Sequence, residues 1–257
     1  MGREMSRMTS RRWAVLGGAL LLVGWQLLAM RLGSLLMATP GQTLQAMARL
    51  PFEADFRLHA GASLLRIVLG VGLGCLLGFC LGLLAGLDAR VRGLLEPLRW
   101  LLMSVPPVVV VVLAMLWVGL GSAMVVLISV LMLAPGMYVN TVKGMQMVDR
   151  GLLEMARVYR FSPWQKLRRL YIPSLTAPLG AALLIATCGG VRLVVMAEVL
   201  GAESGAGFAL ANARSTFDSA GLYAWTLLIL LLVAALEFLL LQPLQRRMGR
   251  WQEAAHA

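Results

Sequence analysis

Six stretches of predominantly apolar residues, each long enough to cross a lipid bilayer as a helix, dominate this sequence. A hydrocarbon core about 30 Å thick requires about 20 such residues per helix. The predicted spans are 13–30, 62–86, 100–120, 123–142, 177–199 and 222–242. Apolar residues make up 60% of the chain and charged residues only 14%, too few polar groups to cover a water-soluble globule. We therefore predict an all-α integral membrane protein with about six transmembrane helices.

The basic residues predict the orientation of these helices. With six spans both termini lie on one side, and 17 of the 23 lysine and arginine residues fall in the segments on that side. They are Arg3, Arg7, Arg11, Arg12, Arg90, Arg92, Arg99, Lys143, Arg150, Arg157, Arg160, Lys166, Arg168, Arg169, Arg246, Arg247 and Arg250. Because cytoplasmic loops are enriched in positive charge, we expect cytoplasmic N and C termini. The same bias explains the net charge of +11 without a nucleic-acid partner.

The N-terminal segment has features of a secretory signal peptide, since residues 1–12 are basic and an apolar run follows. The run is longer than a typical signal peptide requires, and no clear small-residue cleavage site ends it. We therefore interpret 1–12 as a cytoplasmic segment that precedes a retained first span. Residues 13–257 then form a single transmembrane domain.

The sequence lacks the motifs of a catalytic domain. The longest polar stretches, 31–61 and 143–176, are each shorter than the roughly 50 residues of an independent domain. There is no P-loop, no nucleophile elbow and no HExxH motif. The three cysteines and two histidines show no metal-ligand spacing. We predict no enzymatic activity and no cofactor or metal bound by this chain.

Glycine recurs at every fourth position of the second predicted span. The glycines are Gly70, Gly74, Gly78, Gly82 and Gly86. They lie on one face of the helix, where a neighbouring helix can approach closely. We interpret this stripe as packing within one subunit, with a pore lining as the alternative.

Prolines and charges within the spans mark candidate pathway residues. Pro106 and Pro107 predict a break in the third span, which marks either a translocation path or a packing kink. Arg66 is near the outer end of its span and is expected to snorkel toward water. Arg192 lies deeper and is the best candidate for a charge that faces a water-filled cavity, although pairing with a neighbouring helix also fits. We predict Pro106, Arg192 and Glu198 as possible pathway residues.

The polar segment 143–176 predicts two short helices joined by a tight turn. Ser162 is suited to be an N-cap, and Gln165 three residues later completes a capping box. Trp164 begins an apolar stripe opposite a basic face, and Pro173 is expected to stop the second helix. On physical grounds alone, this segment fits an interfacial helix that lies on anionic lipid.

The same segment resembles the EAA loop of binding-protein-dependent ABC importer permeases, whose pattern is E-A-A, three residues, G, nine residues and I-x-L-P. The residues 154–156 take the E-A-A positions, Arg160 takes the glycine position, and 170–173 end the pattern at the matching distance. The resemblance implies that this loop docks as a coupling helix on a separate ATPase. The implied coupling residues are Glu154, Met155, Ala156, Arg160, Phe161, Ser162, Trp164 and Pro173.

Two positions depart from the family pattern. Met155 replaces an alanine, which matters little because both residues are good helix formers. Arg160 replaces a glycine that would take a left-handed conformation, at a cost of roughly 1–2 kcal/mol for any other residue. The turn is therefore expected to be shaped differently, to be strained, or to fit an unusual ATPase groove.

The resemblance extends over nearly the whole chain and is closest to the nitrate/sulfonate/taurine permease family. Its further landmarks are Thr39-Pro40 with Thr43, the segment 63–66, Glu96-Pro97, Pro106 and the segment 197–201. It implies a type I ABC importer permease fold in the bacterial inner membrane. It also implies a homodimer that works with two ATPase subunits, which bind ATP and magnesium, and with an extracytoplasmic solute-binding protein. The implied solute is a small anion such as a sulfonate, taurine, nitrate or bicarbonate, or else a thiamin-precursor pyrimidine.

Two other classes of function remain open at this point. A stand-alone secondary carrier or channel would show an internal repeat with ion-coupling carboxylates at the membrane midplane, and we find no convincing repeat. A membrane scaffold or sensor could use the same loop to recruit a cytoplasmic partner. Measured solute flux would separate this last class from both kinds of transporter.

Overall fold

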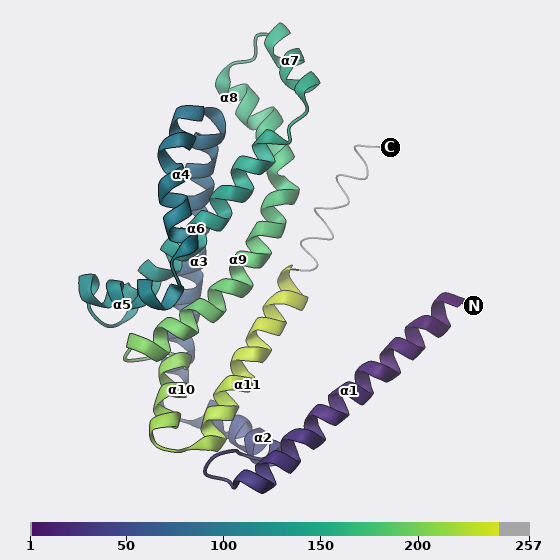
Figure 1. The fold of residues 1–257 in the computed structure, drawn as a ribbon, viewed down its shortest axis with the longest axis vertical. Helices are drawn as coiled ribbons and strands as arrows, with labels where there is room; N and C mark the ends of the chain where they lie inside the picture. The colour runs from purple at the N-terminus through teal and green to yellow at the C-terminus, as the bar shows by residue number, and fades with distance from the viewer. Residues whose placement is uncertain (1, 242–257) are drawn as a thin grey trace. The chain divides into compact units, whose positions relative to one another are not determined.

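We describe residues 2–241 of a computed structural model, in which every secondary-structure element of that range is a helix and none is a strand (Figure 1). The elements are α1 (Gly2–Leu32), α2 (Pro40–Arg49), η1 (Leu50–Phe52), α3 (Phe56–Leu87), α4 (Ala89–Ser104), α5 (Pro107–Val118), α6 (Ser122–Gln146), α7 (Arg150–Val158), α8 (Pro163–Lys166), η2 (Leu167–Tyr171), α9 (Ile172–Gly201), α10 (Ala206–Ser215), α11 (Ser219–Ala235) and η3 (Leu236–Leu241).

Five helices are long and apolar enough to cross a membrane. These segments are Val15–Leu32, Phe56–Leu87, Ser122–Gln146, Pro178–Gly201 and Ser219–Phe238. The pair α4 and α5, bent by 104°, makes a sixth span if it is counted as one broken helix. The predicted fold class, all-α with about six spans, is confirmed. The end of the last predicted span at Gln242 and the predicted cytoplasmic residues Arg246, Arg247 and Arg250 lie outside the described residues.

The chain divides into two compact units. Among the described residues, one unit contains residues 2–57 together with Ala209–Leu230, and the other contains Leu58–Phe208 together with residues 231–241. In the first unit, the indole Nε1 of Trp25 on α1 donates a hydrogen bond to the carbonyl oxygen of Ala38, at 2.9 Å. Thr39, which follows, caps the start of α2. The candidate sites described below all lie in the second unit.

Helix α3 packs closely on α6 through its glycine stripe. A methyl group on Gly82 would lie 2.6 Å from Cβ of Thr141, and one on Gly78 would overlap the carbonyl oxygen of Ala134. Both distances are too short for a real side chain, so only glycine permits this approach. The interpretation of the stripe as packing within one subunit is confirmed.

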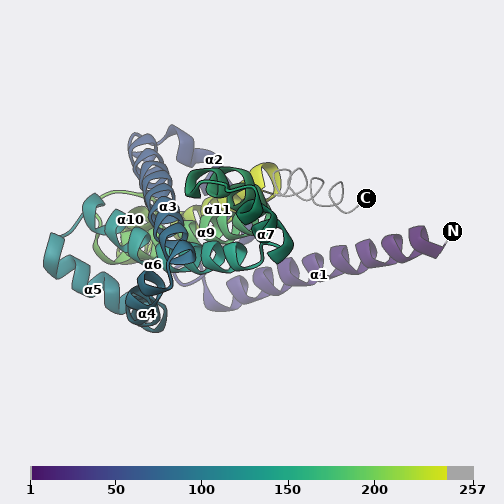
Figure 2. The same ribbon diagram turned by 90° about the horizontal axis from the view of Figure 1, so that it is seen from above.

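Helix α9 packs along α6, and the two helices lie side by side in Figures 1 and 2. Gly144 of α6 meets Leu175 and Pro178 of α9, and Gly190 of α9 meets Val71 of α3. Helices α3, α6 and α9 therefore form the packed centre of the second unit. The side chains of Met124, Ile128 and Leu175 are completely buried within it.

The prediction that Pro173 stops the second helix of the polar loop is wrong. The helix runs from α8 through η2 into α9 without a break, so that Pro173 is the second residue of α9. The segment η2 is π-helical, and the N–H group of Ile172 donates to the carbonyl oxygen of Leu167, five residues earlier. This wider turn leaves room for the proline ring, which would clash with the preceding turn of a regular α-helix.

The predicted break at the two prolines is confirmed. Helix α4 ends at Ser104 and α5 starts at Pro107. Pro106 between them takes an extended conformation, as the residue before a proline prefers. The helix that precedes the break starts at Ala89 rather than near residue 100, because charged residues in its first three turns weaken the apolar signal. Helices α2 and α10 were also missed, since each has ten residues and is too short to cross a membrane.

Adding one methyl group to the glycine stripe is expected to destabilise the protein. In purified protein, Gly78→Ala should lower the free energy of unfolding by about 1–3 kcal/mol, because α3 and α6 must move apart to relieve the overlap. Gly72→Ala is the matched control, since a methyl group on Gly72 of the same helix meets no atom within 4 Å. Thermal unfolding in mild detergent measures both variants, and equal melting temperatures would contradict this packing.

Candidate coupling loop and buried ion-pair network

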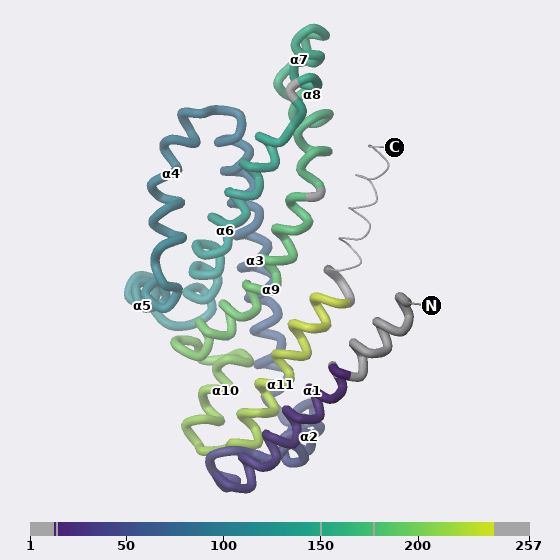
Figure 3. The backbone as a smooth tube through the Cα atoms, turned by 45° about the vertical axis from the view of Figure 1, so that its right-hand side comes forward, coloured from purple at the N-terminus to yellow at the C-terminus, as the bar shows by residue number. Residues whose placement is uncertain are grey.

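Helices α7 and α8 form a hairpin at one end of the second unit, beyond the ends of α3 and α4 (Figure 3). Asp149 caps α7 by accepting a hydrogen bond from the N–H group of Gly151, at 2.6 Å. The hydroxyl of Ser162 accepts from the N–H group of Gln165 at 3.2 Å, and the Gln165 side chain accepts from the N–H group of Ser162 at 2.8 Å. The predicted capping box is confirmed, and it fixes the start of α8.

The turn between α7 and α8 places Arg160 in the left-handed region, with φ at 52°. The N–H group of Phe161 donates to the carbonyl oxygen of Ala156 at 2.9 Å, and that of Arg160 donates to the carbonyl oxygen of Arg157 at 3.0 Å. These two bonds make a Schellman motif, in which the left-handed position usually belongs to glycine. Of the three alternatives for this turn, the structure supports the strained one, because Arg160 takes the left-handed conformation at an expected cost of about 1–2 kcal/mol.

The hairpin exposes apolar side chains at its tip. The exposed fractions are 79% for Val158, 71% for Tyr159 and 65% for Trp164. Ala156, in contrast, is completely buried. Phe161 is half-buried, with the Arg169 guanidinium 5.9 Å from the centre of its ring. Exposed apolar residues at the tip of a short, well-capped hairpin are suited to a protein partner.

The other predicted coupling residues are exposed, like those at the tip of the hairpin. Glu154 and Met155 are exposed on α7, and Ser162 is exposed at the start of α8. Pro173 is also exposed, on α9, two helical segments after α8. The hairpin thus gathers most of the predicted residues, while Ala156 supports it from within. Their role in coupling remains a prediction.

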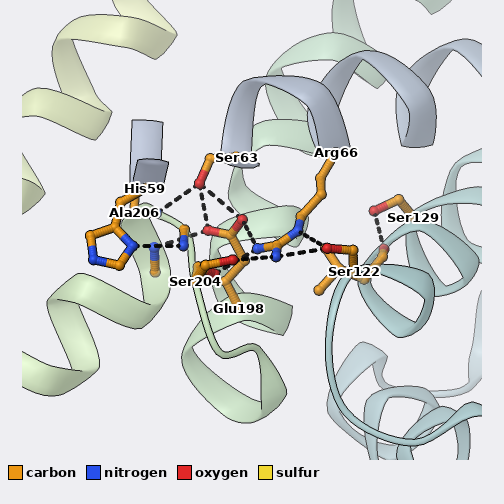
Figure 4. Close-up of polar contacts among 11 residues, drawn as sticks. His59, Ser63, Arg66, Ser122, Ser129, Glu198, Ser204 and Ala206 are labelled. Atoms are coloured by element: carbon orange, nitrogen blue, oxygen red, sulfur yellow. Dashed lines mark hydrogen bonds and ion pairs between the residues drawn. The ribbon is translucent and has the colours of Figure 1, made fainter. Parts of the chain in front are cut away.

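At the opposite end of α9, Glu198 forms a buried ion pair with Arg66 of α3 (Figure 4). The distance from Arg66 Nη1 to Glu198 Oε1 is 2.7 Å. Arg66 is 3% exposed and Glu198 is 1% exposed, so both charges are removed from solvent. These residues are 132 positions apart in the sequence, and the packing of α3 near α9 brings them together.

Every N–H group of the Arg66 guanidinium faces an acceptor. Nη1 also donates to the carbonyl oxygen of Ser204, at 2.6 Å. Nη2 donates to the hydroxyls of Ser122 and Ser204, both at 2.8 Å, and Nε donates to the Ser122 hydroxyl at 3.1 Å. The guanidinium therefore joins α3 to the first residue of α6 and to the connection between α9 and α10.

Both oxygens of the Glu198 carboxylate also accept hydrogen bonds. The carboxylate accepts from the Ser63 hydroxyl at 2.7 Å and from the N–H group of Gly207 at 3.0 Å. Gly207 lies in the first turn of α10, where a negative charge also interacts favourably with the helix dipole. The N–H group of Ala206 donates to the Ser63 hydroxyl at 2.7 Å, and that of Gly205 donates to His59 Nδ1 at 3.2 Å. The network thus fixes the whole α9–α10 connection.

The expectation that Arg66 snorkels toward water is wrong. Its side chain is buried because a carboxylate from a distant helix lies at the same depth, and a paired charge costs far less in the interior than an isolated one. Reasoning along one helix could not find this partner. The available signal was that an arginine and a glutamate, which are opposite in charge, each lie within a predicted span.

The three predicted pathway residues occupy different environments. Glu198 is held in the network, whereas Pro106 and Arg192 are exposed on the α4–α5 connection and on α9. The role of each in a pathway remains a prediction. Among the described residues, no group of three or more histidine, cysteine, aspartate or glutamate side chains could hold a metal ion.

Residues 78–250 match the family described as the inner membrane component of binding-protein-dependent transport systems. The chain is 29% identical to the putative aliphatic sulfonates permease SsuC of Bacillus subtilis, over 85% of this chain and 79% of the relative. It is 28% identical to the taurine permease TauC of Escherichia coli, over 90% and 86%. It is also 28% identical to the formylaminopyrimidine permease ThiX of Halalkalibacterium halodurans, over 91% and 93%.

Among solved structures, the fold is similar to a chain of the MetNI methionine ABC transporter in an inward-facing conformation. The TM-score is 0.61, and the match covers 79% of this chain and 97% of that one. The sequence identity is 18%, so this likeness concerns the fold alone.

Removing one partner of the buried ion pair is expected to destabilise the protein strongly. Arg66→Met or Glu198→Leu should each lower the free energy of unfolding by about 3–5 kcal/mol, because each leaves an uncompensated buried charge. The double variant should lose much less than the sum of the two. Unfolding of the purified proteins in detergent measures this cycle, and strictly additive losses would show that the two residues do not interact.

Proposed function

Because this chain belongs to the family of inner membrane components of binding-protein-dependent transport systems, we propose that it forms the pathway for a small organic anion and couples to an ATPase through the α7–α8 hairpin. It is a transmembrane permease subunit with the type I ABC importer fold. It is not an enzyme, since a separate ATPase hydrolyses ATP in such systems. The family also implies a solute-binding protein as a partner.

The exposed tip of the α7–α8 hairpin is the single observation that carries the coupling proposal. Trp164 and Tyr159 present apolar surface beyond the packed helices, and Glu154 is an exposed carboxylate on α7. Aromatic residues at the centre of an interface contribute most of the binding free energy. The hairpin carries Arg157, Arg160 and Lys166 against the one carboxylate of Glu154, so an ATPase groove with apolar walls and an acidic rim would fit it.

The continuous helix behind the hairpin would transmit the movement of the ATPase. From Pro163 to Gly201, helices α8, η2 and α9 follow one another without a break, a length of about 55–60 Å at 1.5 Å per residue. A displacement of the hairpin would move this helix as a lever. The packing of α9 against α6 would then shift between inward-open and outward-open arrangements, and ATP binding would set their balance.

We further propose the assembly that the family resemblance implies. Two copies of this chain would enclose one pathway in the bacterial inner membrane, with cytoplasmic termini, two ATPase subunits and one solute-binding protein. ATP and magnesium would be bound by the ATPase subunits. The basic residues concentrated on one side of the membrane support this orientation.

For the solute, we propose a sulfonate such as taurine. The support is that several relatives are sulfonate or taurine permeases, although the identities are below 30%. An exposed arginine within a span, Arg192, would attract an anion. A second candidate is a thiamin-precursor pyrimidine, favoured by the similarity to the formylaminopyrimidine permease.

Charge changes on the hairpin are expected to disrupt coupling. In the complex purified from native membranes, Trp164→Asp and Glu154→Lys should each reduce the ATPase retained by the tagged permease about tenfold, equivalent to about 1.4 kcal/mol of binding free energy. Quantitative mass spectrometry of the complex measures the retained subunit.

Phe52→Asp is the matched control for these variants. Phe52 is 89% exposed in the loop on the predicted outer side, so its replacement changes an exposed aromatic residue without touching the hairpin. If the hairpin variants retain as much ATPase as the control, the coupling assignment is wrong.

Growth on different sulfur sources tests the solute. A deletion strain should fail to grow with taurine or an alkanesulfonate as the only sulfur source and should grow normally on sulfate, because sulfate enters by another system. Reintroduction of the gene should restore growth. Normal growth on sulfonates together with a new requirement for thiamin would instead favour the pyrimidine.

A further inference from the structure

A second ion pair, on α4, contrasts with the buried pair of Arg66 and Glu198. Arg99 Nε donates to Glu96 Oε2 at 3.0 Å, and Arg99 Nη2 donates to the other oxygen of the same carboxylate. The side chains are 26% exposed for Arg99 and 52% exposed for Glu96. This pair is therefore open to its surroundings, whereas the other pair is sealed within the fold.

The sequence predicts Arg99 in a cytoplasmic segment, just before a span that starts at residue 100. That placement is wrong, because α4 starts at Ala89 and carries Arg99 well into the span. Arg99 is ten residues from Ala89 at the predicted cytoplasmic end of α4, a rise of about 15 Å. On the neighbouring α6, Tyr138 is eight residues from Gln146 at the same side, a rise of about 12 Å. Exposed charges at this depth are costly in contact with lipid and usually face a water-filled cavity or a protein partner.

Behind the pair, a cavity of about 160 Å³ lies between α3, α4 and α6. Arg99 and Tyr138 line it, and its other walls are apolar side chains such as Leu81, Leu98 and Pro135. The Tyr138 hydroxyl is buried and has no hydrogen-bond partner, and the residue as a whole is 5% exposed. A buried hydroxyl without a partner is unusual, and a ligand oxygen in the cavity would satisfy it once the Tyr138 side chain turns toward the cavity.

The Arg99 guanidinium also keeps donor capacity for a ligand. Its Nη1 lies 3.4 Å from the sulfur of Met103, which is only a weak acceptor. The N–H groups of Arg66, by comparison, are all directed at oxygen acceptors. Of these two arginines, Arg99 is the one that can bind a solute without breaking the packing of the helices.

We propose that Arg99 and Tyr138 form an anion-binding position in the cytoplasmic half of the solute pathway. The ligand is a small organic anion with a sulfonate or carboxylate group, which accepts from Arg99 Nη1 and from the Tyr138 hydroxyl, while its apolar carbons lie in the cavity. Glu96 is the resident counter-ion that neutralises Arg99 when no solute is bound. This inference rests on the proposed function, since it assumes a pathway and an anionic solute.

Labelling of cysteines tests whether this face of α4 lines a pathway, independently of the solute. In the full complex, with Cys75, Cys80 and Cys188 replaced by alanine, Arg99→Cys should react with a membrane-impermeant sulfonate-bearing thiosulfonate added to inverted vesicles. Leu101→Cys is the matched control, because Leu101 is also exposed but lies about 200° around the helix from Arg99. Equal, slow labelling of both positions would overturn the proposal.

Uptake of taurine by the reconstituted complex tests the binding position. Arg99→Gln and Tyr138→Phe should each reduce the specificity constant for uptake at least tenfold, with complex assembly unchanged. Arg99→Lys should restore part of the loss, because it keeps the charge. Uptake at the wild-type rate by both Arg99→Gln and Tyr138→Phe would overturn the proposal.

The two experiments separate this inference from the proposed function. If the wild-type complex takes up no taurine, the proposed solute is wrong, and the labelling contrast between Arg99→Cys and Leu101→Cys decides whether α4 lines a pathway. If taurine is taken up but neither labelling nor variants show an effect, the proposed function stands and this inference fails.

Discussion

The high cost of a charge in hydrocarbon determines how this chain arranges its ionisable residues. Arg66 and Glu198 meet that cost by complete enclosure, with an acceptor or donor for each polar atom. Their network in turn fixes the α9–α10 connection and holds it to α3 and α6. Glu96 and Arg99 are not enclosed. They pair with each other on an exposed face of α4. One pair stabilises the fold, and the other is available for function.

Close helix packing makes the enclosed pair possible. The glycine stripe on α3 brings its backbone against α6, and Gly190 brings α9 near α3 at the same level of the bundle. Larger residues at these positions would separate the helices and leave Glu198 too far from Arg66 for direct contact. The ion pair therefore depends on helix packing, through contacts that begin one turn from Arg66 at Gly70 and about two turns from Glu198 at Gly190.

Features with a local cause could be predicted from the sequence. The number of spans follows from runs of apolar residues, the break after α4 follows from two prolines, and the start of α8 follows from the capping pair Ser162 and Gln165. In each of these cases, neighbouring residues alone determine the backbone. The left-handed turn at Arg160 could be expected for a different reason, because Arg160 takes the glycine position of the family pattern.

Features that depend on distant residues could not be predicted in this way. The partner of Arg66 lies on another helix, and the continuation of the helix through Pro173 depends on a π-helical turn that no local rule requires. The start of α4 was missed because charged residues obscure its apolar face, and the role of that face depends on α3 and α6. The cavity beside Arg99 and Tyr138 is lined by three helices together, so the sequence of α4 alone could not predict it.

The left-handed arginine at the hairpin corner has a consequence for the exchange of subunits between importers. At this corner a glycine would present bare backbone, whereas Arg160 presents a long, exposed cation. An ATPase that fits against the hairpin must leave room for this side chain and offer it an acceptor or open water. A subunit shaped around a glycine corner would meet steric overlap there, so the permease and its ATPase would be expected to change together during evolution.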